Sequence, residues 1–310
     1  MAATPESPLI GSLGNLTLDD EDGEEEDETS EEELDENVLD GYMTNDRRIH
    51  PDIVEGIQSM DRNTRLDATV KIRRLLQSER WSPAVVVQPV LDSGLLPEII
   101  KMLSSDDHEF LWESTWIVVN ITAGSSEQTS TVVQAGVIPK LVTLFRTSPD
   151  NVRINILMAI GNVLGDSEHL RQVAIREGGF ELALDVLRDP DNHSPSCVDS
   201  AAWTMTSATT SNYGGLPDDD LAARTVLVLA TFIHNHGDDI SESLVEAVTA
   251  LRQLSIHRNV TAVVKQCGIN SQIFRLFTAE NDRLREAALY LVVNMSRESD
   301  ASLQEMMDAG

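Results

Sequence analysis

Aromatic residues make up only 4% of this chain of 310 residues, although 41% of its residues are hydrophobic. A hydrophobic complement drawn mainly from Leu, Val, Ile and Ala is more typical of stacked helices than of an aromatic-cored β-sandwich. Cysteine is equally scarce: Cys197 and Cys267 are the only two, and neither has a CxxC partner. The sequence therefore predicts neither a disulfide framework nor a zinc site, and it favours a reducing compartment.

Long apolar runs are also lacking. No stretch approaches the roughly 20 consecutive apolar residues that span a bilayer. The N-terminus has neither the basic region nor the apolar region of a secretory signal. We therefore expect a soluble, intracellular protein with no membrane partner.

Basic residues are outnumbered, with 23 Lys and Arg against 52 Asp and Glu and a net charge of −29. Nucleic-acid binding needs clustered Lys and Arg, so this balance argues against DNA or RNA as a direct partner. A strongly acidic surface attracts and steers molecules of the opposite charge. The expected partner is therefore basic.

The first 46 residues contain no Lys or Arg and 17 acidic residues, so they carry −17 and the remainder carries −29 − (−17) = −12. A segment so charged and so poor in apolar residues cannot offset its ordering entropy. We predict a disordered acidic tail over residues 1–46 and one folded region over residues 47–310. The tail either solubilises the protein or competes for its basic partners.

Two independent markers repeat along the folded region with one period. The first is a glycine: Gly94, Gly136 and Gly178 are separated by 42 and 42 residues, Gly268 follows after 90, and Gly310 after a further 42. The second is a polar position at residues 120, 162, 207, 253 and 294, with spacings of 42, 45, 46 and 41. Two markers that share one spacing indicate an internal repeat.

A period in the low forties built from helical segments is the length of an armadillo or HEAT unit. Each unit reads as a short helix, a glycine bend, a second helix often begun by proline (Pro97, Pro139) and a longer third helix, which favours armadillo. We predict an all-α armadillo-repeat solenoid, a right-handed superhelix of about six repeats, the first degenerate and the last incomplete. The third helices are predicted at residues 108–123, 150–164, 196–209, 242–256 and 283–296.

The stretch from Trp116 to Thr129 reads Trp-Ile-Val-Val-Asn-Ile-Thr-Ala-Gly-Ser-Ser-Glu-Gln-Thr, and its Ser125 and Gln128 form a predicted capping box. This stretch and the Ala-Ile-Gly-Asn-Val-Leu-Gly-Asp-Ser that begins at Ala159 resemble consecutive repeats of importin-α, the nuclear-import adaptor. The similarity runs from about residue 64 to residue 310. It implies a groove, lined by the third helices, that binds Lys/Arg-rich nuclear localisation peptides, in a protein of the cytoplasm and the nucleus.

The physical chemistry of such a groove explains these residue types. Trp rings form channels for the aliphatic stems of Lys and Arg and attract each charge by about 0.5–2 kcal/mol. Asn side chains can hold the backbone of an extended peptide. The resemblance implies a lysine pocket made by Gly124, Thr129 and Asp166. The full set of implied peptide-binding residues is Trp116, Asn120, Gly124, Thr129, Asn155, Met158, Asn162, Asp166, Trp203, Ser207, Glu246, Tyr290 and Asn294.

A structural interpretation stands beside the functional one. A Trp on an apolar helical face is commonly part of a core, and an Asn near a helix end is commonly a cap. Recurrence of a polar residue at the same phase of several units favours a functional face, because a repeated polar residue is unfavourable on a buried one.

The chain also departs from the pattern of the family. Met158 replaces a Trp and Ser207 replaces an Asn, and two later positions are also changed, so we expect one basic-peptide site and an eroded groove beyond the fourth unit. Family members carry a basic importin-β-binding segment at the N-terminus, whereas here the region is acidic and Arg47-Arg48 is its only basic pair. Importin-β binding is therefore either lost or arranged differently.

Catalytic motifs are lacking: the sequence has no G-x-x-x-x-G-K, G-x-S-x-G or H-E-x-x-H. Paired carboxylates carry no information in so acidic a chain. We expect neither enzyme activity nor a cofactor or metal. The alternative to a nuclear import adaptor is an acidic scaffold or chaperone-like protein that sequesters basic proteins without motif specificity.

Overall fold

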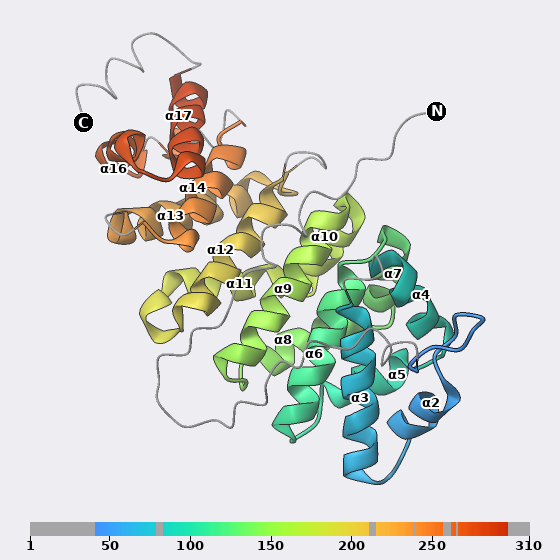
Figure 1. Cartoon of the computed structure of the whole chain (residues 1–310). Helices are drawn as coiled ribbons and strands as arrows, with labels where there is room; N and C mark the ends of the chain where they lie inside the picture. The colour runs from blue at the N-terminus through green and yellow to red at the C-terminus, as the bar shows by residue number, and fades with distance from the viewer. Residues whose placement is uncertain are drawn as a thin grey trace, which may run out of the picture.

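The computed structural model describes residues 41–78, 83–210, 215–237, 240–256, 262–264 and 266–296, so residues 1–40 of the predicted tail and residues 297–310 of the predicted last repeat lie outside it. Within these ranges the chain is helical, apart from one isolated β-bridge between Met43 and Ile49. The helices stack into an elongated array that keeps the order of the chain from one end to the other (Figure 1). The predicted all-α armadillo solenoid is confirmed.

Six units follow one another in the described part of the chain. The first contains α2 (Pro51–Ile57) and α3 (Arg62–Leu76). The next three have three helices each: α4 (Pro83–Asp92), α5 (Leu96–Met102) and α6 (His108–Thr122); α7 (Ser126–Gln134), α8 (Val137–Phe145) and α9 (Asp150–Asp166); α10 (Glu168–Arg176), α11 (Gly179–Arg188) and α12 (Pro195–Thr209). The fifth has α13 (Asp219–His236) and α14 (Glu242–Leu254), and the last ends with α16 (Asn270–Arg275) and α17 (Asp282–Ser296).

Left-handed glycines make the turn between the first and second helices of a unit. Gly136 precedes α8 with φ of 82°, and Gly178 precedes α11 with φ of 88°. A side chain is strained in this conformation, so the turn keeps a glycine wherever it occurs. This geometry explains the 42-residue glycine marker. The predicted capping box of Ser125 and Gln128 is also present at the start of α7.

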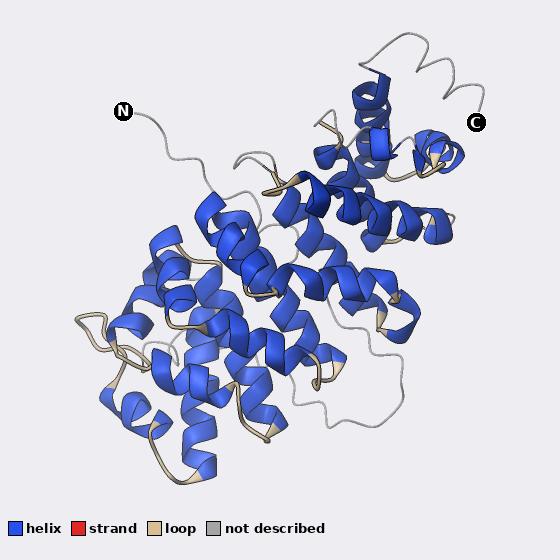
Figure 2. Ribbon diagram, turned by 180° about the vertical axis from the view of Figure 1, so that it is seen from behind, coloured by secondary structure: helices blue, strands red, loops and turns tan. Residues whose placement is uncertain are grey.

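The third helices form the continuous spine of the molecule. α3 packs on α6, α6 on α9, α9 on α12, α12 on α14, and α14 on α17. Buried apolar side chains from Tyr42 to Met295 join into one core along this row. Seen from behind, loops drawn in tan join successive helices of the array (Figure 2). None of the helices in the described ranges combines the length and the apolar character needed to cross a bilayer.

The fifth unit departs from the three-helix pattern expected of every unit. α13 runs without interruption for 18 residues where the preceding three units have two separate helices. No glycine falls inside α13, so the backbone has no left-handed residue at which to turn. The gap of 90 residues between Gly178 and Gly268 is the sequence counterpart of this fusion.

The described chain begins with a packed turn that precedes α2. Tyr42 is 7% exposed within the core, and its carbonyl accepts a hydrogen bond from the backbone N–H of His50 at 2.9 Å. The predicted boundary at residue 46 lies within this turn, and Tyr42 is the first buried residue of the described chain.

Candidate functional site

Amide side chains link third helices to the preceding ones near their C-terminal ends. Asn162 on α9 donates from Nδ2 to the carbonyl of Val119 at 3.3 Å and to Oγ1 of Thr122 at 3.3 Å, both on α6. Asn294 on α17 makes the corresponding contact with Oγ of Ser255 at 3.0 Å. The recurring Asn thus has a structural task, because its amide links the C-terminal turns of two adjacent third helices.

Two members of the polar series make different contacts. Asn120 on α6 turns back and donates to the carbonyl of Trp116 in its own helix at 2.8 Å. Ser207 on α12 is buried, and its Oγ has no hydrogen-bond partner among the described residues. The serine side chain is one bond shorter than that of Asn162, and it makes no such link to the preceding helix.

Five predicted residues form two half-buried stripes on neighbouring third helices. Trp116 and Asn120 are one turn apart on α6, and Met158, Asn162 and Asp166 follow one another by single turns on α9. Residues four apart lie on one helical face, and the contacts of Asn162 with α6 hold the two stripes side by side. We call these five residues the ladder face.

An aromatic pair lies at the edge of the ladder face nearest α3. The rings of Trp112 and Trp116 meet edge-on, with centroids 6.2 Å apart and planes at 71°. The guanidinium of Arg73, from α3, lies 4.9 Å from the Trp112 centroid, and its Nε donates to Oε2 of Glu113 at 2.6 Å. Burial raises the pKa of Glu113, and the adjacent Arg73 opposes that rise. A cation of the chain therefore already occupies this aromatic wall.

Trp203 is largely covered by the neighbouring unit. It is 5% exposed, and a Cβ added to Gly161 of α9 would come within 2.3 Å of its ring. Glycine at this position leaves the room that the indole fills. Trp203 therefore acts mainly as packing between α9 and α12, whereas Met158 at the same phase of α9 is half-buried.

Asp166 lines a pocket of about 380 Å³ between α7 and α10. Its Oδ2 is buried and accepts no hydrogen bond from the described residues. A buried carboxylate oxygen without a donor is unfavourable, so Asp166 retains an unused capacity to accept a hydrogen bond. The pocket is lined by Ser126, Glu127, Ser130, Thr131, Gln134, Asp166, Ser167, His169 and Leu170.

The other two residues of the implied lysine pocket have structural tasks. Thr129 is fully buried, and its Oγ1 donates to the carbonyl of Thr122 at 3.1 Å. Arg171, 42 residues later, makes the equivalent contact with the end of α9. Gly124 lies where a Cβ would come within 2.4 Å of Oε1 of Gln128, so a glycine here accommodates the capping box. The structure does not bring the Thr129 hydroxyl to the surface.

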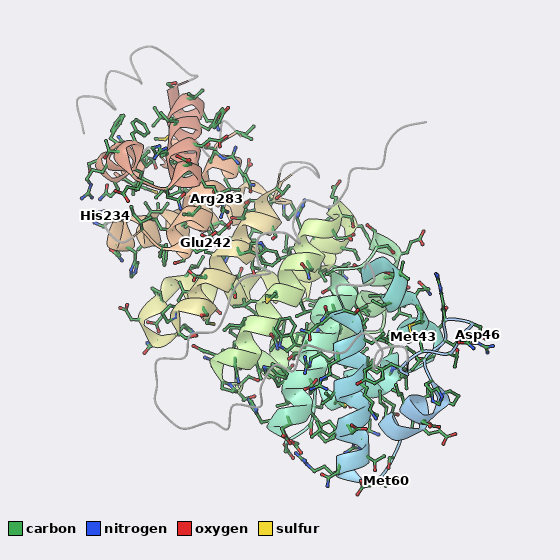
Figure 3. The ribbon with its side chains drawn as sticks, viewed as in Figure 1. Met43, Asp46, Met60, His234, Glu242 and Arg283 are labelled. Carbon is green, nitrogen blue, oxygen red and sulfur yellow. The ribbon has the colours of Figure 1, made fainter. Side chains whose placement is uncertain are left out.

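Two more predicted contact residues are buried and already paired. Asn155 is 1% exposed and donates from Nδ2 to Oγ1 of Thr115 at 3.2 Å. Glu246 is 3% exposed and accepts from Nη2 of Arg283 at 2.5 Å, while Nη1 of Arg283 binds Glu242 at 2.5 Å. Figure 3 shows Arg283 of α17 beside Glu242 of α14. These side chains hold neighbouring units together.

The last two predicted residues lie on α17, away from the ladder face. Tyr290 is 51% exposed, and the guanidinium of Arg252 lies 5.9 Å from its ring centroid. Asn294 is 8% exposed and is engaged with the end of α14.

Three residues that matter for this surface were missed in the sequence: Arg73, Arg283 and Gly161. A glycine inside a helical pattern is a readable sign of close approach by a neighbour, so Gly161 could have been found. The two arginines left no comparable signal, because only the stacked structure shows which carboxylate each one reaches.

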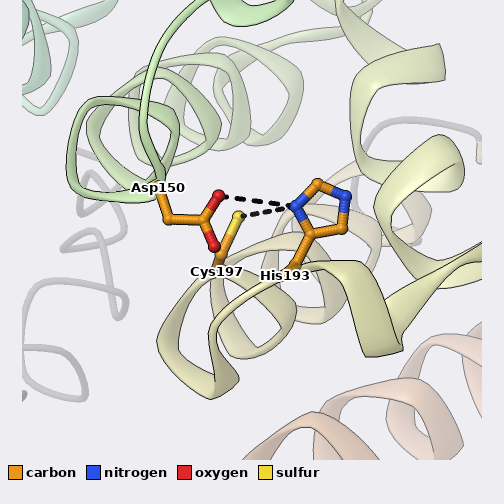
Figure 4. Close-up of side chains that lie close together, drawn as sticks. All are labelled: Asp150, His193 and Cys197. Atoms are coloured by element: carbon orange, nitrogen blue, oxygen red, sulfur yellow. Dashed lines mark hydrogen bonds and ion pairs between the residues drawn. The ribbon is translucent and has the colours of Figure 1, made fainter. Parts of the chain in front are cut away.

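A separate cluster joins the start of α9 to the start of α12 (Figure 4). Nδ1 of His193 lies 3.5 Å from Oδ1 of Asp150 and 3.9 Å from Sγ of Cys197, and within the described part of the chain these three residues form the single group with metal-ligand spacing. However, Nη1 of Arg153 lies 3.2 Å from Asp150 Oδ1 and 3.5 Å from His193 Nδ1, so a cation already stands among these atoms.

The thiol of this cluster is also poorly suited to chemistry. Burial raises the pKa of Cys197 to about 12, with the negative charge of Asp150 adding to the rise. The thiolate is the form that attacks electrophiles and binds metals. Asp150 in turn accepts a hydrogen bond from the backbone N–H of Ser194, the N-cap residue of α12. The cluster therefore holds the start of α9 against the start of α12 in the next unit.

Comparison with known proteins agrees with the armadillo fold and finds sequence relatives. The family model for the Armadillo/beta-catenin-like repeat matches residues 125–164, which are α7 to most of α9. Importin subunit alpha-1b of Oryza sativa subsp. japonica is 28% identical over 246 residues, covering 78% of this chain and 44% of that protein. Importin subunit alpha-2 of Arabidopsis thaliana is 31% identical over 195 residues, covering 61% of this chain and 34% of that protein.

Solved structures of low sequence identity share the fold. A designed armadillo repeat protein in complex with the peptide (KR)4 matches with a TM-score of 0.68 at 20% identity, over 78% of this chain and 98% of that one. An engineered protein matches with a TM-score of 0.70 at 21% identity, over 83% of this chain and 60% of that one.

The chain spans less than half the length of these curated relatives. The chain is an armadillo-repeat solenoid whose sequence relatives are importin α subunits.

Proposed function

We propose that this protein is a non-enzymatic adaptor that binds an extended Lys/Arg-rich peptide of the nuclear-localisation type on its ladder face. The observation that carries the proposal is Asp166, which lines the pocket between α7 and α10 and whose Oδ2 accepts no hydrogen bond from the described residues. A lysine ammonium offers three donors and a full positive charge, which suits this oxygen. Asp166 lies one turn from Asn162 and two turns from Met158, so a cation held there belongs to a chain that crosses the ladder face.

The surrounding side chains fit the same ligand. The half-buried Trp116 and Met158 offer apolar surface to the aliphatic stems of basic residues. The chain without its first 46 residues still carries −12, from −29 − (−17), so its field attracts basic peptides. The relatives are named as importin α subunits, and the designed neighbour was solved with a (KR)4 peptide.

Partner and location follow from this ligand. Cargo proteins that display such a peptide are the proposed partners, and the proposed places of action are the cytoplasm and the nucleus. We do not propose importin-β as a partner, because Arg47 and Arg48 are the only basic pair before α2 and the Arg48 guanidinium is already paired with Asp46.

The direct test is a fluorescence-anisotropy titration with a labelled peptide that carries one basic cluster. Asp166→Asn removes the charge and keeps the shape, so affinity should fall about 10- to 100-fold, as expected for one charge-assisted hydrogen bond. Asp185→Asn makes the same charge change at an exposed site on α11, where the carboxylate pairs with Arg188, and should leave affinity unchanged. Equal losses in both variants would mean that only the general field matters.

The acidic-scaffold alternative is tested by deleting residues 1–40, which removes 16 of the 17 acidic residues of the predicted tail and keeps the packed turn at Tyr42. The ladder face remains intact in that truncated chain, so our proposal expects retained or tighter binding of the peptide. Loss of binding would support sequestration by the acidic tail.

A further inference from the structure

At each end of the row, beyond the ladder face, acidic or aromatic side chains of third helices are paired with arginines of the chain itself. Arg73 lies over Trp112 and binds Glu113, and Arg283 binds both Glu242 and Glu246. We infer that these arginines act as internal occupants which close the binding surface at both ends, so that the protein selects peptides with a single short basic cluster. This inference rests on the proposed function and specifies its ligand.

The occupant at the α3 side is held tightly. The Arg73 and Glu113 side chains are 16% and 8% exposed, and their contact distance is 2.6 Å. A peptide cation that approaches Trp112 meets a guanidinium of the same sign, which is already paired with Glu113. The ladder face therefore ends at Trp116 in this direction.

The occupant at the far side is Arg283. It reaches from the first turn of α17 to Glu242, in the first turn of α14, and to Glu246, one turn further on. The Glu246 side chain is 4% exposed, so a ligand can reach its carboxylate only after Arg283 leaves. Arg252 stands beside Tyr290 in the same way, 5.9 Å from the ring centroid.

The open window between the two occupants limits ligand length. Packed helices lie about 8–10 Å apart, so α6, α9 and α12 together span about 16–20 Å. An extended peptide advances about 3.3 Å per residue, so five or six residues cross this window. A second basic cluster placed further along a peptide would extend toward α14 and α17, where Arg283 already fills the acidic positions.

The experiment compares two peptides on the full chain: one with a single five-residue basic cluster, and one with a second such cluster after a neutral linker. Wild type should bind both within about twofold, the statistical advantage of carrying two clusters. Arg283→Ala frees Glu242 and Glu246, so it should bind the two-cluster peptide at least about fivefold more tightly than the short one. Arg285→Ala is the matched control, since it removes the same charge from α17 where the partner Asp282 is exposed.

A second variant guards against misfolding of Arg283→Ala. Glu242→Gln removes the more exposed of the two acids that Arg283 binds. This variant should bind both peptides with the affinity of wild type, because the acid contacts Arg283 and not the ligand. A drop in affinity for the two-cluster peptide would overturn the inference. A wild-type preference of about fivefold or more for that peptide would also overturn it while leaving the proposed function intact. Failure of wild type to bind either peptide would overturn both.

Discussion

The indole ring of Trp203 lies against the backbone of Gly161, so closely that a Cβ on Gly161 would come within 2.3 Å of the ring. The contact sets how near α12 approaches α9, and it explains why Trp203 is only 5% exposed.

Gly161→Ala should therefore destabilise the protein. Overpacking against the ring should lower the free energy of unfolding by about 1–3 kcal/mol, which exceeds the roughly 1 kcal/mol that alanine gains over glycine inside a helix. Urea unfolding followed by circular dichroism measures the change. In a Trp203→Leu background the clash is relieved and the same substitution should be nearly neutral; an equal penalty in both backgrounds would contradict the contact.

Asn162 and Asn120 should respond differently to the same substitution. Asn162→Ser breaks the hydrogen bonds to Val119 and Thr122 and reproduces the situation of Ser207, so the free energy of unfolding should fall by about 1 kcal/mol. Asn120→Ser breaks only a bond within α6 and should change stability by less than about 0.5 kcal/mol. Chemical denaturation of the two variants makes the comparison, and equal losses would show that the link between units contributes nothing.

Asp150 and Asp199 make similar contacts with the next unit and have opposite pKa shifts. Each accepts a hydrogen bond from a backbone N–H at the start of the next third helix, at Ser194 and Ser243 respectively. Burial raises the pKa of both carboxyls. At Asp150, however, hydrogen bonds led by that of Ser194, with a contribution from Arg153, outweigh burial and hold the pKa below its usual range, whereas at Asp199 burial prevails.

These shifts predict opposite effects of amide substitution. Asp150→Asn should lower stability at neutral pH by about 1 kcal/mol. Folding favours the ionised form of Asp150, so this difference should vanish as pH falls through its folded-state pKa, below about 4. Asp199→Asn keeps the acceptor and removes a buried charge, so stability at neutral pH should rise slightly, and the gain should disappear below the unfolded pKa of about 3.9. Urea midpoints across pH provide the measurement, and changes of the same sign at neutral pH would refute the assignment.

Both cysteines should be slow toward thiol reagents in the folded protein. Burial raises the pKa of the Cys197 thiol to about 12 and also raises that of Cys267. At about pH 8 little thiolate is present, and the thiolate is the reactive form. A disulfide-exchange assay should show slower reaction at the buried Cys197 than at the half-buried Cys267, and rapid reaction of both after denaturation. Fast labelling of native Cys197 would contradict its burial.

The sequence was sufficient to predict the fold and the positions of the third helices. α6, α9 and α14 begin at His108, Asp150 and Glu242, as predicted. A periodic apolar face marks all three helices, and a capping side chain marks the starts of α6 and α14. The single long helix α13 was not predicted. Its only sign in the sequence is the missing glycine between Gly178 and Gly268, and an absent residue does not show that two helices are joined.

The candidate site was predicted less completely. Periodicity places Thr129, Asn155 and Glu246 on the correct elements, but it does not show that their polar groups bind Thr122, Thr115 and Arg283. Those partners lie between 7 and 40 residues away and meet only when units stack. The partner of each polar group is set by how the units stack, and the apolar periodicity of a single helix gives no information about it.

The locks between units have a mechanical consequence. At one end of α9, Asp150 holds Ser194 of the following unit, and near the other end Asn162 holds α6 of the preceding one. Each such bond contributes only about 1 kcal/mol net, and each third helix packs chiefly on its immediate neighbours. We therefore expect small tilts at successive joints to add up along the row, so that the pitch of the solenoid can vary with little change in free energy.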